Sequence, residues 1–172
     1  DVAMFHKIPS LKRLLADSRR QRRRLSDCGE VEFAIDTSTP ESKIVIREMI
    51  NLKRQRYRAQ NTRDQLRNTC VQRFYEELFS QVGRDGRVYI STLKVDSEVI
   101  AVHWGIVYRD RFYYLMPAFK GGSWEKMSAG RLLLEFLVEW SIGEGFKTFD
   151  FTIGAEEYKK SWCDSKEVLF QI

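Results

Sequence analysis

Residues 111–152, RFYYLMPAFKGGSWEKMSAGRLLLEFLVEWSIGEGFKTFDFT, decide the fold expected for this chain. In order they predict a strand (111–119), a Ser-Ala-Gly turn (128–130), a helix with an apolar face (132–140) and a second strand (147–152). An α/β protein presents the N-terminus of a helix to a phosphate in this order of elements. We therefore expect a phosphate-facing helix start between two strands.

A polar and aromatic cluster, residues 150–162 (DFTIGAEEYKKSW), begins where the second strand ends. Ligands of open α/β sheets bind just beyond the carboxyl ends of the strands. The pattern therefore favours an enzyme that uses a phosphate-bearing cofactor, with a binding module as the second interpretation.

The rest of the chain predicts helices where apolar residues recur at helical spacing and strands where they alternate with polar residues. The expected helices are 10–27, 41–57, 63–81 and a short segment 158–162, and the further expected strands are 31–36, 88–95, 99–108 and 168–172. Helix 63–81 carries apolar residues at steps of four, at Leu66, Cys70, Phe74 and Leu78. Short connections at Asp96-Ser97 and Arg109-Asp110 join three of the strands into a meander.

The composition excludes disordered and membrane proteins. A length of 172 residues suits one domain, and the chain, with 43% hydrophobic and 31% charged residues, is too apolar for disorder and too charged for a membrane protein. No apolar run approaches the roughly 18 residues that a spanning helix needs. We therefore expect a soluble globular domain without membrane insertion.

Cysteines and histidines are few. Cys28, Cys70 and Cys163 form an odd set without paired spacing, which argues against a disulfide framework or a zinc site and indicates a cytoplasmic setting. With His6 and His103 as the histidines, we expect no metal. Because the chain opens at Asp1 rather than Met, we expect it to be a fragment of a longer protein.

Positive charge is concentrated in the first half of the chain. Residues 1–75 hold 17 basic and 9 acidic side chains, whereas residues 76–172 hold 12 and 15. Five arginines fall within the six positions from Arg19 to Arg24, so they surround one helix and most must be solvated. They either form a plain solvated face or bind a polyanion: nucleic acid, an anionic polysaccharide or an acidic part of the protein itself.

A family resemblance emerges from several of these motifs together. They are VIAV (99–102), FYYL (112–115), Ser128-Ala129-Gly130 before a leucine-rich helix, Phe149-Asp150-Phe151 with Gly154, and Glu157-Tyr158-Lys159 with Trp162. In this succession the chain resembles the CelD-type branch of the GNAT acyltransferases, a branch similar in fold to the FemAB aminoacyl transferases. The resemblance covers about residues 85–172.

The resemblance implies an α/β (α+β) fold with a mixed, mostly antiparallel twisted sheet, a central splay and flanking helices. It implies one domain over residues 1–172, with a helical part (1–82) and a part holding the meander and the cofactor site (83–172). Members of this branch often contain two such halves, so we expect this chain to be the C-terminal half of a longer one.

The resemblance also implies a cofactor site at the helix start. If Ser128 caps the helix, the backbone N–H groups from Ala129 through Gly130 and Arg131 to Leu132 are unpaired and face a pyrophosphate, and the alternative is an ordinary capped helix start. The side chains expected to add charge there are Lys126, Arg131 and Lys159. The family's loop usually reads Gln/Arg-x-x-Gly-x-Gly/Ala, whereas this one, KMSAGR (126–131), keeps one glycine.

Tyr158 lies where related GNAT enzymes often place a tyrosine that acts as general acid toward the departing thiolate. The alternative is a tyrosine that packs on Trp162. Candidates for the general base are Asp150, Glu156, Glu157 and His103. The alternatives are a hydrogen-bonding anchor for Asp150, a solvated face for Glu157 and a buried neutral imidazole for His103.

Three functions follow from these residues. The first is acyl transfer from acetyl-CoA or another acyl-CoA to an amine or hydroxyl of a small molecule or saccharide, in polysaccharide or cell-envelope biosynthesis. The second is a FemAB-like transferase that uses aminoacyl-tRNA, which the basic first half and the altered loop favour. The third is a non-catalytic scaffold that pairs with a missing N-terminal half or with a second copy.

Overall fold

The computed structural model describes residues 1–36, 40–80 and 86–168. The α-helices are α1 (Val2–Phe5), α2 (Lys12–Ser26), α3 (Pro40–Ala59), α4 (Thr69–Ser80), α5 (Ala129–Gly143) and α6 (Glu157–Lys160). The 3₁₀ turns are η1 (Pro9–Leu11), η2 (Gln65–Arg67) and η3 (Gly122–Met127). The strands are β1 (Val31–Asp36), β2 (Gly86–Val95), β3 (Glu98–Tyr108), β4 (Arg111–Phe119) and β5 (Thr148–Asp150).

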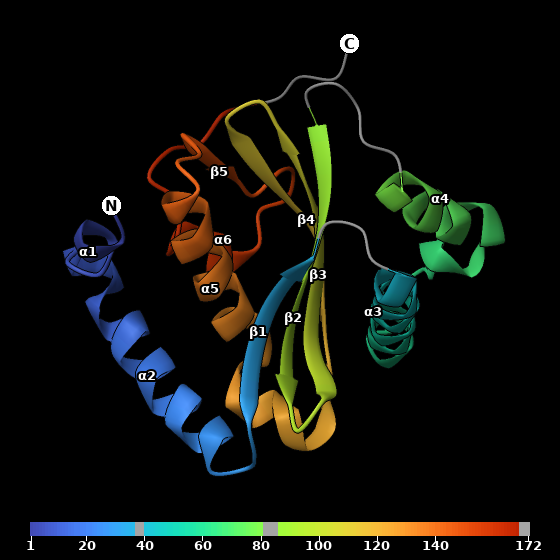
Figure 1. The fold of residues 1–172 in the computed structure, drawn as a ribbon, viewed down its shortest axis with the longest axis horizontal. Coiled ribbons are helices and arrows are strands. Elements are labelled where there is room, and N and C mark those ends of the chain that lie inside the picture. The colour runs from blue at the N-terminus through green and yellow to red at the C-terminus, as the bar shows by residue number, and fades with distance from the viewer. Residues whose placement is uncertain (37–39, 81–85, 169–172) are drawn as a thin grey trace.

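The described strands form one sheet in the order β1-β2-β3-β4-β5. Neighbouring strands are antiparallel, except that β4 and β5 are parallel because α5 forms the crossover between them. Helices α3 and α4 cover one face of the sheet, and α1, α2 and α5 lie on the other (Figure 1). This mixed, mostly antiparallel sheet flanked by helices confirms the predicted fold class.

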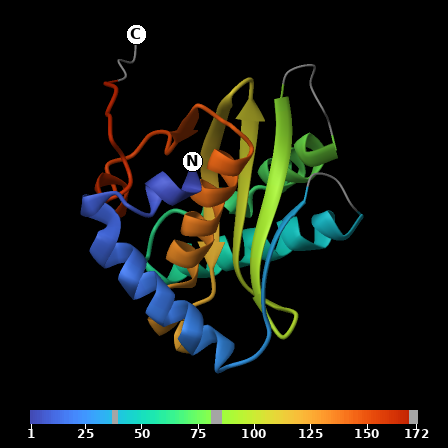
Figure 2. The same cartoon turned by 60° about the vertical axis from the view of Figure 1, so that its left-hand side comes forward.

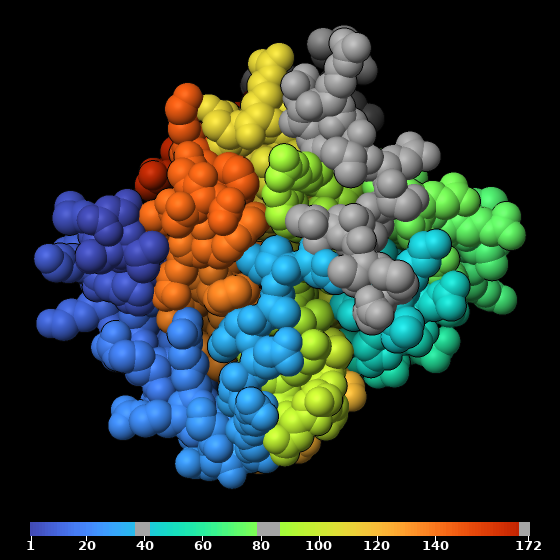
Figure 3. Space-filling view, in the orientation of Figure 1, coloured from blue at the N-terminus to red at the C-terminus, as the bar shows by residue number. Residues whose placement is uncertain are grey.

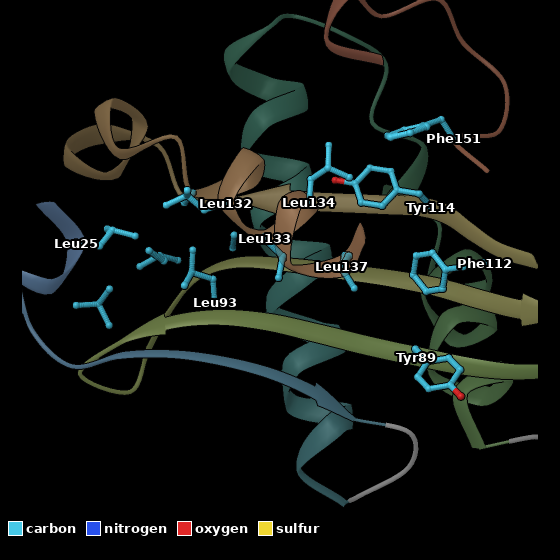
Figure 4. Close-up of a cluster of buried hydrophobic side chains, with 14 of the residues drawn as sticks. Leu25, Tyr89, Leu93, Phe112, Tyr114, Leu132, Leu133, Leu134, Leu137 and Phe151 are labelled. Carbon is cyan, nitrogen blue, oxygen red and sulfur yellow. The ribbon is translucent and has the colours of Figure 1, made fainter. Parts of the chain in front are cut away.

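Alternation along β3 divides the apolar core between the two faces of the sheet. Val102 and Trp104 are buried beneath α3, whereas Ala101 is buried on the opposite face beneath α5. Leu132 and Leu137 of α5 are fully buried in that second cluster, which Figure 4 shows. Burying each leucine contributes about 1.5–3 kcal/mol, so the predicted apolar face of α5 holds this helix on the sheet.

The turn between β2 and β3 confirms the tight connection expected at Asp96-Ser97. Both residues adopt left-handed backbone conformations, with φ of 48° and 69°. The Asp96 side chain accepts a hydrogen bond from the N–H of Glu30, and the Asp96 N–H donates to the Glu30 carbonyl. These bonds tie the turn to the start of β1, which offsets the absence of glycine.

Helix α4 is shorter than expected and buries a different face. The α-helix begins at Thr69 rather than residue 63, and Phe74 is 53% exposed. The side chains that pack inward are Val71, Tyr75 and Leu78. A step of four residues turns an α-helix by about 400°, so a strict row at steps of four drifts around the helix and leaves the buried face.

The last part of the chain also departs from expectation. Strand β5 ends at Asp150 instead of Thr152, because Thr152 adopts a left-handed backbone with φ of 57°. The short helix α6 spans Glu157–Lys160 rather than 158–162. The final strand expected at 168–172 falls, beyond Val168, outside the described residues.

Helix α2 occupies most of the predicted helix 10–27 and lies alongside α5, as Figures 1 and 2 show from two sides. The arginine run serves two roles. Arg22 reaches α5 and places Nη2 3.0 Å from Glu135 Oε1, whereas Arg19, Arg23 and Arg24 are exposed. None of the described helices combines the length and the hydropathy that crossing a bilayer requires.

Candidate active site

The sheet opens between β4 and β5. The described pairing of these strands runs from Arg111 opposite Thr148 to Tyr113 opposite Asp150. Beyond this point β4 continues to Phe119, whereas β5 ends at Asp150 and the segment after it turns away from β4. Residues 114–119, which we call the open edge of β4, therefore have no strand beside them on that side within the described residues, and this is the expected central splay.

A β-bulge at Leu115 lies on the open edge. Trp104 pairs with Met116 and Gly105 with Tyr114, which leaves Leu115 as the extra residue. The Leu115 N–H donates to Nε2 of His103 at 3.2 Å instead of to the backbone of β3. The bulge therefore depends on a side chain of the neighbouring strand.

His103 is fully buried and stacks on the Tyr114 ring, with centroids 4.3 Å apart and planes 4° from parallel. Gly105 makes room for it, because a Cβ there would lie 2.4 Å from the His103 ring. Burial, and then the charge of Lys53, lowers the pKa of His103 to about 3. The ring therefore stays neutral near pH 7, as the alternative interpretation expected, and the structure gives no support to a general base here.

Asp150 is engaged on both carboxylate oxygens. Oδ2 accepts from Arg111 Nη1 at 2.7 Å, and Oδ1 accepts from the Thr152 N–H at 2.7 Å. The second bond holds the turn that ends β5. Asp150 thus has the geometry of the anchor interpretation.

Tyr158 projects from α6 toward the end of β5 and is 41% exposed. Its ring meets Phe151 edge-on, with centroids 6.3 Å apart. Trp162 stacks on Phe5 of α1 instead, so the alternative interpretation of a tyrosine that packs on Trp162 is wrong. Burial first, and then the Glu156 charge, raises the pKa of Tyr158 to about 12, so the phenol keeps its proton at neutral pH.

Glu157 and Lys159 have partners within their own segment. The Glu157 side chain is 84% exposed and pairs with Lys160 at 2.6 Å, which matches the solvated alternative. Lys159 is buried, and its Nζ lies 2.8 Å from both the Ile153 carbonyl and the Glu156 carboxylate. Lys159 therefore anchors α6, and its ammonium is not presented to a phosphate.

The start of α5 differs from the predicted cap. Ser128 occupies the N-cap position with a left-handed φ of 54°, and its side chain makes no capping bond. Its carbonyl accepts from the N–H groups of Arg131 at 2.9 Å and Leu132 at 3.1 Å. Among the described residues, the Ala129 and Gly130 N–H groups have no partner, so two of the four expected donors remain free.

Gly130 allows the first turn of α5 to touch the open edge of β4. A Cβ at Gly130 would lie 2.7 Å from the Phe119 ring. The guanidinium of Arg56, from α3, lies 4.4 Å from the centroid of the same ring. Arg131 instead pairs with Asp17 of α2, so the cation that lies beside Phe119 is Arg56 rather than Arg131. Lys126 is exposed at the end of η3.

Sequence reasoning missed Lys53 and Arg56 of α3. Lys53 donates to the Pro117 carbonyl on the open edge of β4 at 3.0 Å, and burial followed by the nearby Arg56 charge lowers its pKa. Neither side chain forms an ion pair with any described residue, whereas Arg54 pairs with Asp64. The three-residue spacing of Lys53 and Arg56 was a usable signal, because such residues share one side of a helix.

Comparisons with known proteins fit this geometry. No curated protein matches the chain. Two structures of an aminoglycoside acetyltransferase, meta-AAC0020 from an uncultured soil metagenomic sample, are similar over 83% of this chain and 93% of that one. The complex with sisomicin has a TM-score of 0.54 at 11% identity, and the complex with trehalose 0.50 at 12%.

At such identities the two structures show a shared fold. A model of the acetyltransferase (GNAT) domain family matches residues 12–160, which include α2 to α6 and all the described strands. This match covers most of the chain and includes β4, α5 and β5, the elements around the open edge of β4. The chain therefore belongs to the GNAT acetyltransferase family.

Proposed function

We propose that this protein transfers an acyl group from an acyl-CoA, acetyl-CoA above all, to an amine or hydroxyl of a small molecule or saccharide. The observation that carries the proposal is the open edge of β4 beside the first turn of α5, in a chain of the GNAT family. The sequence resemblance supports three finer proposals: a CelD-like branch, a role in polysaccharide or cell-envelope biosynthesis, and a longer protein of which this chain is the C-terminal half. The composition supports a cytoplasmic location.

The residues at the start of α5 fit a pyrophosphate. The free N–H groups of Ala129 and Gly130 point to the N-terminal end of the helix, where anions bind. The Phe119 ring packs directly against Gly130, which leaves no space for a side chain there and fixes the first turn of α5 beside the open edge of β4. Lys126 and Arg56 would supply the positive charge, and the bound thioester would supply the activated acyl group.

Tyr158 is proposed to stabilise the leaving thiolate. A thiol has a pKa of about 8.5 and is thus a stronger acid than a phenol whose pKa is raised to about 12. Complete proton transfer from Tyr158 is therefore uphill. The phenol acts instead by donating a hydrogen bond to the sulfur as the carbon–sulfur bond breaks.

An amine acceptor is proposed to react in its uncharged form, with water accepting the proton that it loses. Asp150 is doubly bonded, His103 is neutral and buried, and Glu157 is solvated and paired. Lys159 lowers the pKa of Glu156, which makes that carboxylate a weak base. The nitrogen attacks the thioester carbon, the thiolate leaves, and the amine proton passes to solvent. The rate should therefore rise with pH up to the pKa of the acceptor amine.

Thermal unfolding with acetyl-CoA tests the donor. A ligand at 100 times its Kd stabilises the fold by about 2.7 kcal/mol, which is readily measured. Release of free thiol on addition of amino sugars, followed spectroscopically, then tests the transfer. The absence of any stabilisation at millimolar acetyl-CoA contradicts the proposal, and salt-sensitive binding of aminoacyl-tRNA in the same assay would favour the FemAB-like alternative.

A further inference from the structure

A cavity of about 700 Å³ lies between α2, the first turn of α5 and the end of α6. The size is in the range of small-molecule sites, roughly 300–1,000 Å³. Arg13, Arg20 and Asp17 line it from α2, Arg131 lines it from α5, and Ser161 lines it from the residue after α6. Figure 3 shows the neighbouring surfaces of the N-terminal helices (blue) and α5 (orange).

The cavity is positively charged. Asp17 is the carboxylate on its wall, and it pairs with both Arg20, at 2.5 Å, and Arg131. With Arg13, three arginines and one carboxylate therefore line the cavity. Arg13 forms no ion pair with any residue that the structure describes, and its exposed side chain is free to meet an anion.

Part of the cavity wall is apolar. Leu14 and Ala16 line it beside the arginines, so one side presents hydrocarbon and the other presents fork-shaped donors. A guanidinium matches a phosphate through paired N–H donors. A ligand with a planar apolar base and a phosphate satisfies both parts, whereas inorganic phosphate satisfies one.

The position of the cavity connects it with the donor site. Arg131 follows Gly130, whose N–H is free, and Ser161 follows α6, which carries Tyr158. We infer that the cavity binds the phosphorylated nucleotide end of the acyl donor, with Arg13 and Arg20 of α2 holding its phosphate and Leu14 contacting its base. This inference rests on the proposed function. It assigns to α2, which packs outside the sheet, a part in donor specificity.

Calorimetric titration of the intact chain tests the assignment with CoA, 3′-dephospho-CoA and adenosine 3′,5′-bisphosphate. The wild-type chain should bind CoA about 10-fold more tightly than 3′-dephospho-CoA, and it should bind the bisphosphate. Arg13→Gln and Arg20→Gln should each remove most of this discrimination. Arg23→Gln is the matched control, because Arg23 is exposed on the same helix and does not line the cavity.

The outcomes separate the two proposals. If the wild-type chain binds CoA but Arg13→Gln and Arg20→Gln bind all three ligands as it does, the nucleotide assignment is wrong and the acyltransferase proposal stands. If the wild-type chain binds none of the ligands, the acyl-CoA proposal fails as well. Binding of tRNA in place of CoA, lost in Arg13→Gln, overturns the assignment in favour of a nucleic-acid site. Circular dichroism of each variant verifies that the fold is intact.

Discussion

At the scale of single residues, environment separates side chains that look alike in the sequence. Glu156 and Glu157 are adjacent, yet Glu156 holds the buried Lys159 and Glu157 is solvated. Tyr158 follows them and keeps a partly exposed phenol next to Phe151 at the opening of the sheet. Among the nominated catalytic residues, Tyr158 is the one whose polar group forms no hydrogen bond or ion pair with another residue that the structure describes.

Replacing Tyr158 with Phe should lower kcat and leave donor affinity unchanged. A hydrogen bond to a developing thiolate is charge-assisted, and its loss should slow turnover by about 10- to 100-fold. Steady-state kinetics with acetyl-CoA, together with a direct titration of CoA, separate the two effects. Tyr108→Phe, an exposed tyrosine at the far end of β3, is the control. An unchanged kcat for Tyr158→Phe would remove the role.

Gly130→Ala should weaken donor binding without unfolding the protein. The new methyl group would lie 2.7 Å from the Phe119 ring, so the ring and the Arg56 guanidinium stacked on it must move away from the start of α5. We expect a loss of about 10-fold in CoA affinity by calorimetry. Gly143→Ala, at the end of the same helix with open space around it, should bind CoA normally. Equal affinities for the two variants would show that this contact is irrelevant to binding.

At the scale of elements, helix α2 is attached to α5 by charge as well as by apolar contacts. Glu135 of α5 is almost fully buried and is reached by Arg22 of α2, whose side chain is 35% exposed. Burial first raises the pKa of Glu135, and Arg22 acts in the opposite direction. One member of the arginine run therefore binds an acidic part of the protein itself, which was one of the interpretations left open by the sequence.

Arg22→Gln should lower the free energy of unfolding by about 2 kcal/mol at pH 7, because it leaves the Glu135 carboxylate buried without its cation. A carboxyl whose folded pKa is raised favours folding at low pH, and this contribution is lost as pH rises through the folded pKa. The cost of the substitution should therefore shrink between pH 7 and pH 5. Urea unfolding at both values measures it. Arg23→Gln, on the exposed side, should stay within about 0.5 kcal/mol of wild type, and a pH-independent cost for Arg22→Gln would contradict this account.

At the scale of the whole molecule, one sheet separates two apolar clusters, and β3 runs through its middle. His103 lies on this central strand and holds the bulge of β4 through the Leu115 N–H. The same buried imidazole therefore shapes the open edge of β4 and packs in the core. Because it is neutral in the folded protein, protonation of His103 should favour the unfolded state.

The contribution of His103 to the free energy of unfolding should fall as pH drops below about 6.5. The pKa of His103 is about 3 in the fold and near 6.5 in the unfolded chain, so the unfolded state binds the proton first and gains from it. The contribution of His103 is complete above pH 6.5 and is lost progressively toward pH 3. At pH 5 it should be lower than at pH 7 by about 2 kcal/mol.

Urea unfolding of wild type and His103→Gln at pH 7 and pH 5 measures this term. The variant should be less stable at pH 7, since the bulge loses its imidazole, but its stability should fall less on acidification. The comparison uses the difference between pH values, so other titrating groups, including Glu135, cancel. Identical pH dependence in the two proteins would show that His103 does not carry the effect.

Much of the fold was predictable because it depends on local patterns. The meander from β2 to β4, the apolar face of α5 and the strand after it follow from spacing between residues a few positions apart. The errors arose where the pattern was read too regularly, as with Phe74 in α4, or where a turn ended an element early, as with Thr152 after β5. Both were decided by packing and backbone conformation beyond the local pattern.

The sequence alone determined the order of elements, the position of the helix start at Ser128 and the nomination of Tyr158, because each depends on neighbours along the chain. The tertiary structure decided which charged groups remain available. Arg111 reaches Asp150 across 39 residues, and Arg131 reaches Asp17 across 114. Lys53 and Arg56 lie at the open edge of β4, although the sequence of their helix, α3, contains no motif that predicts this position. Ion pairing, burial and pKa depend on distance in space, and folding brings together groups whose separation along the chain gives no sign of it.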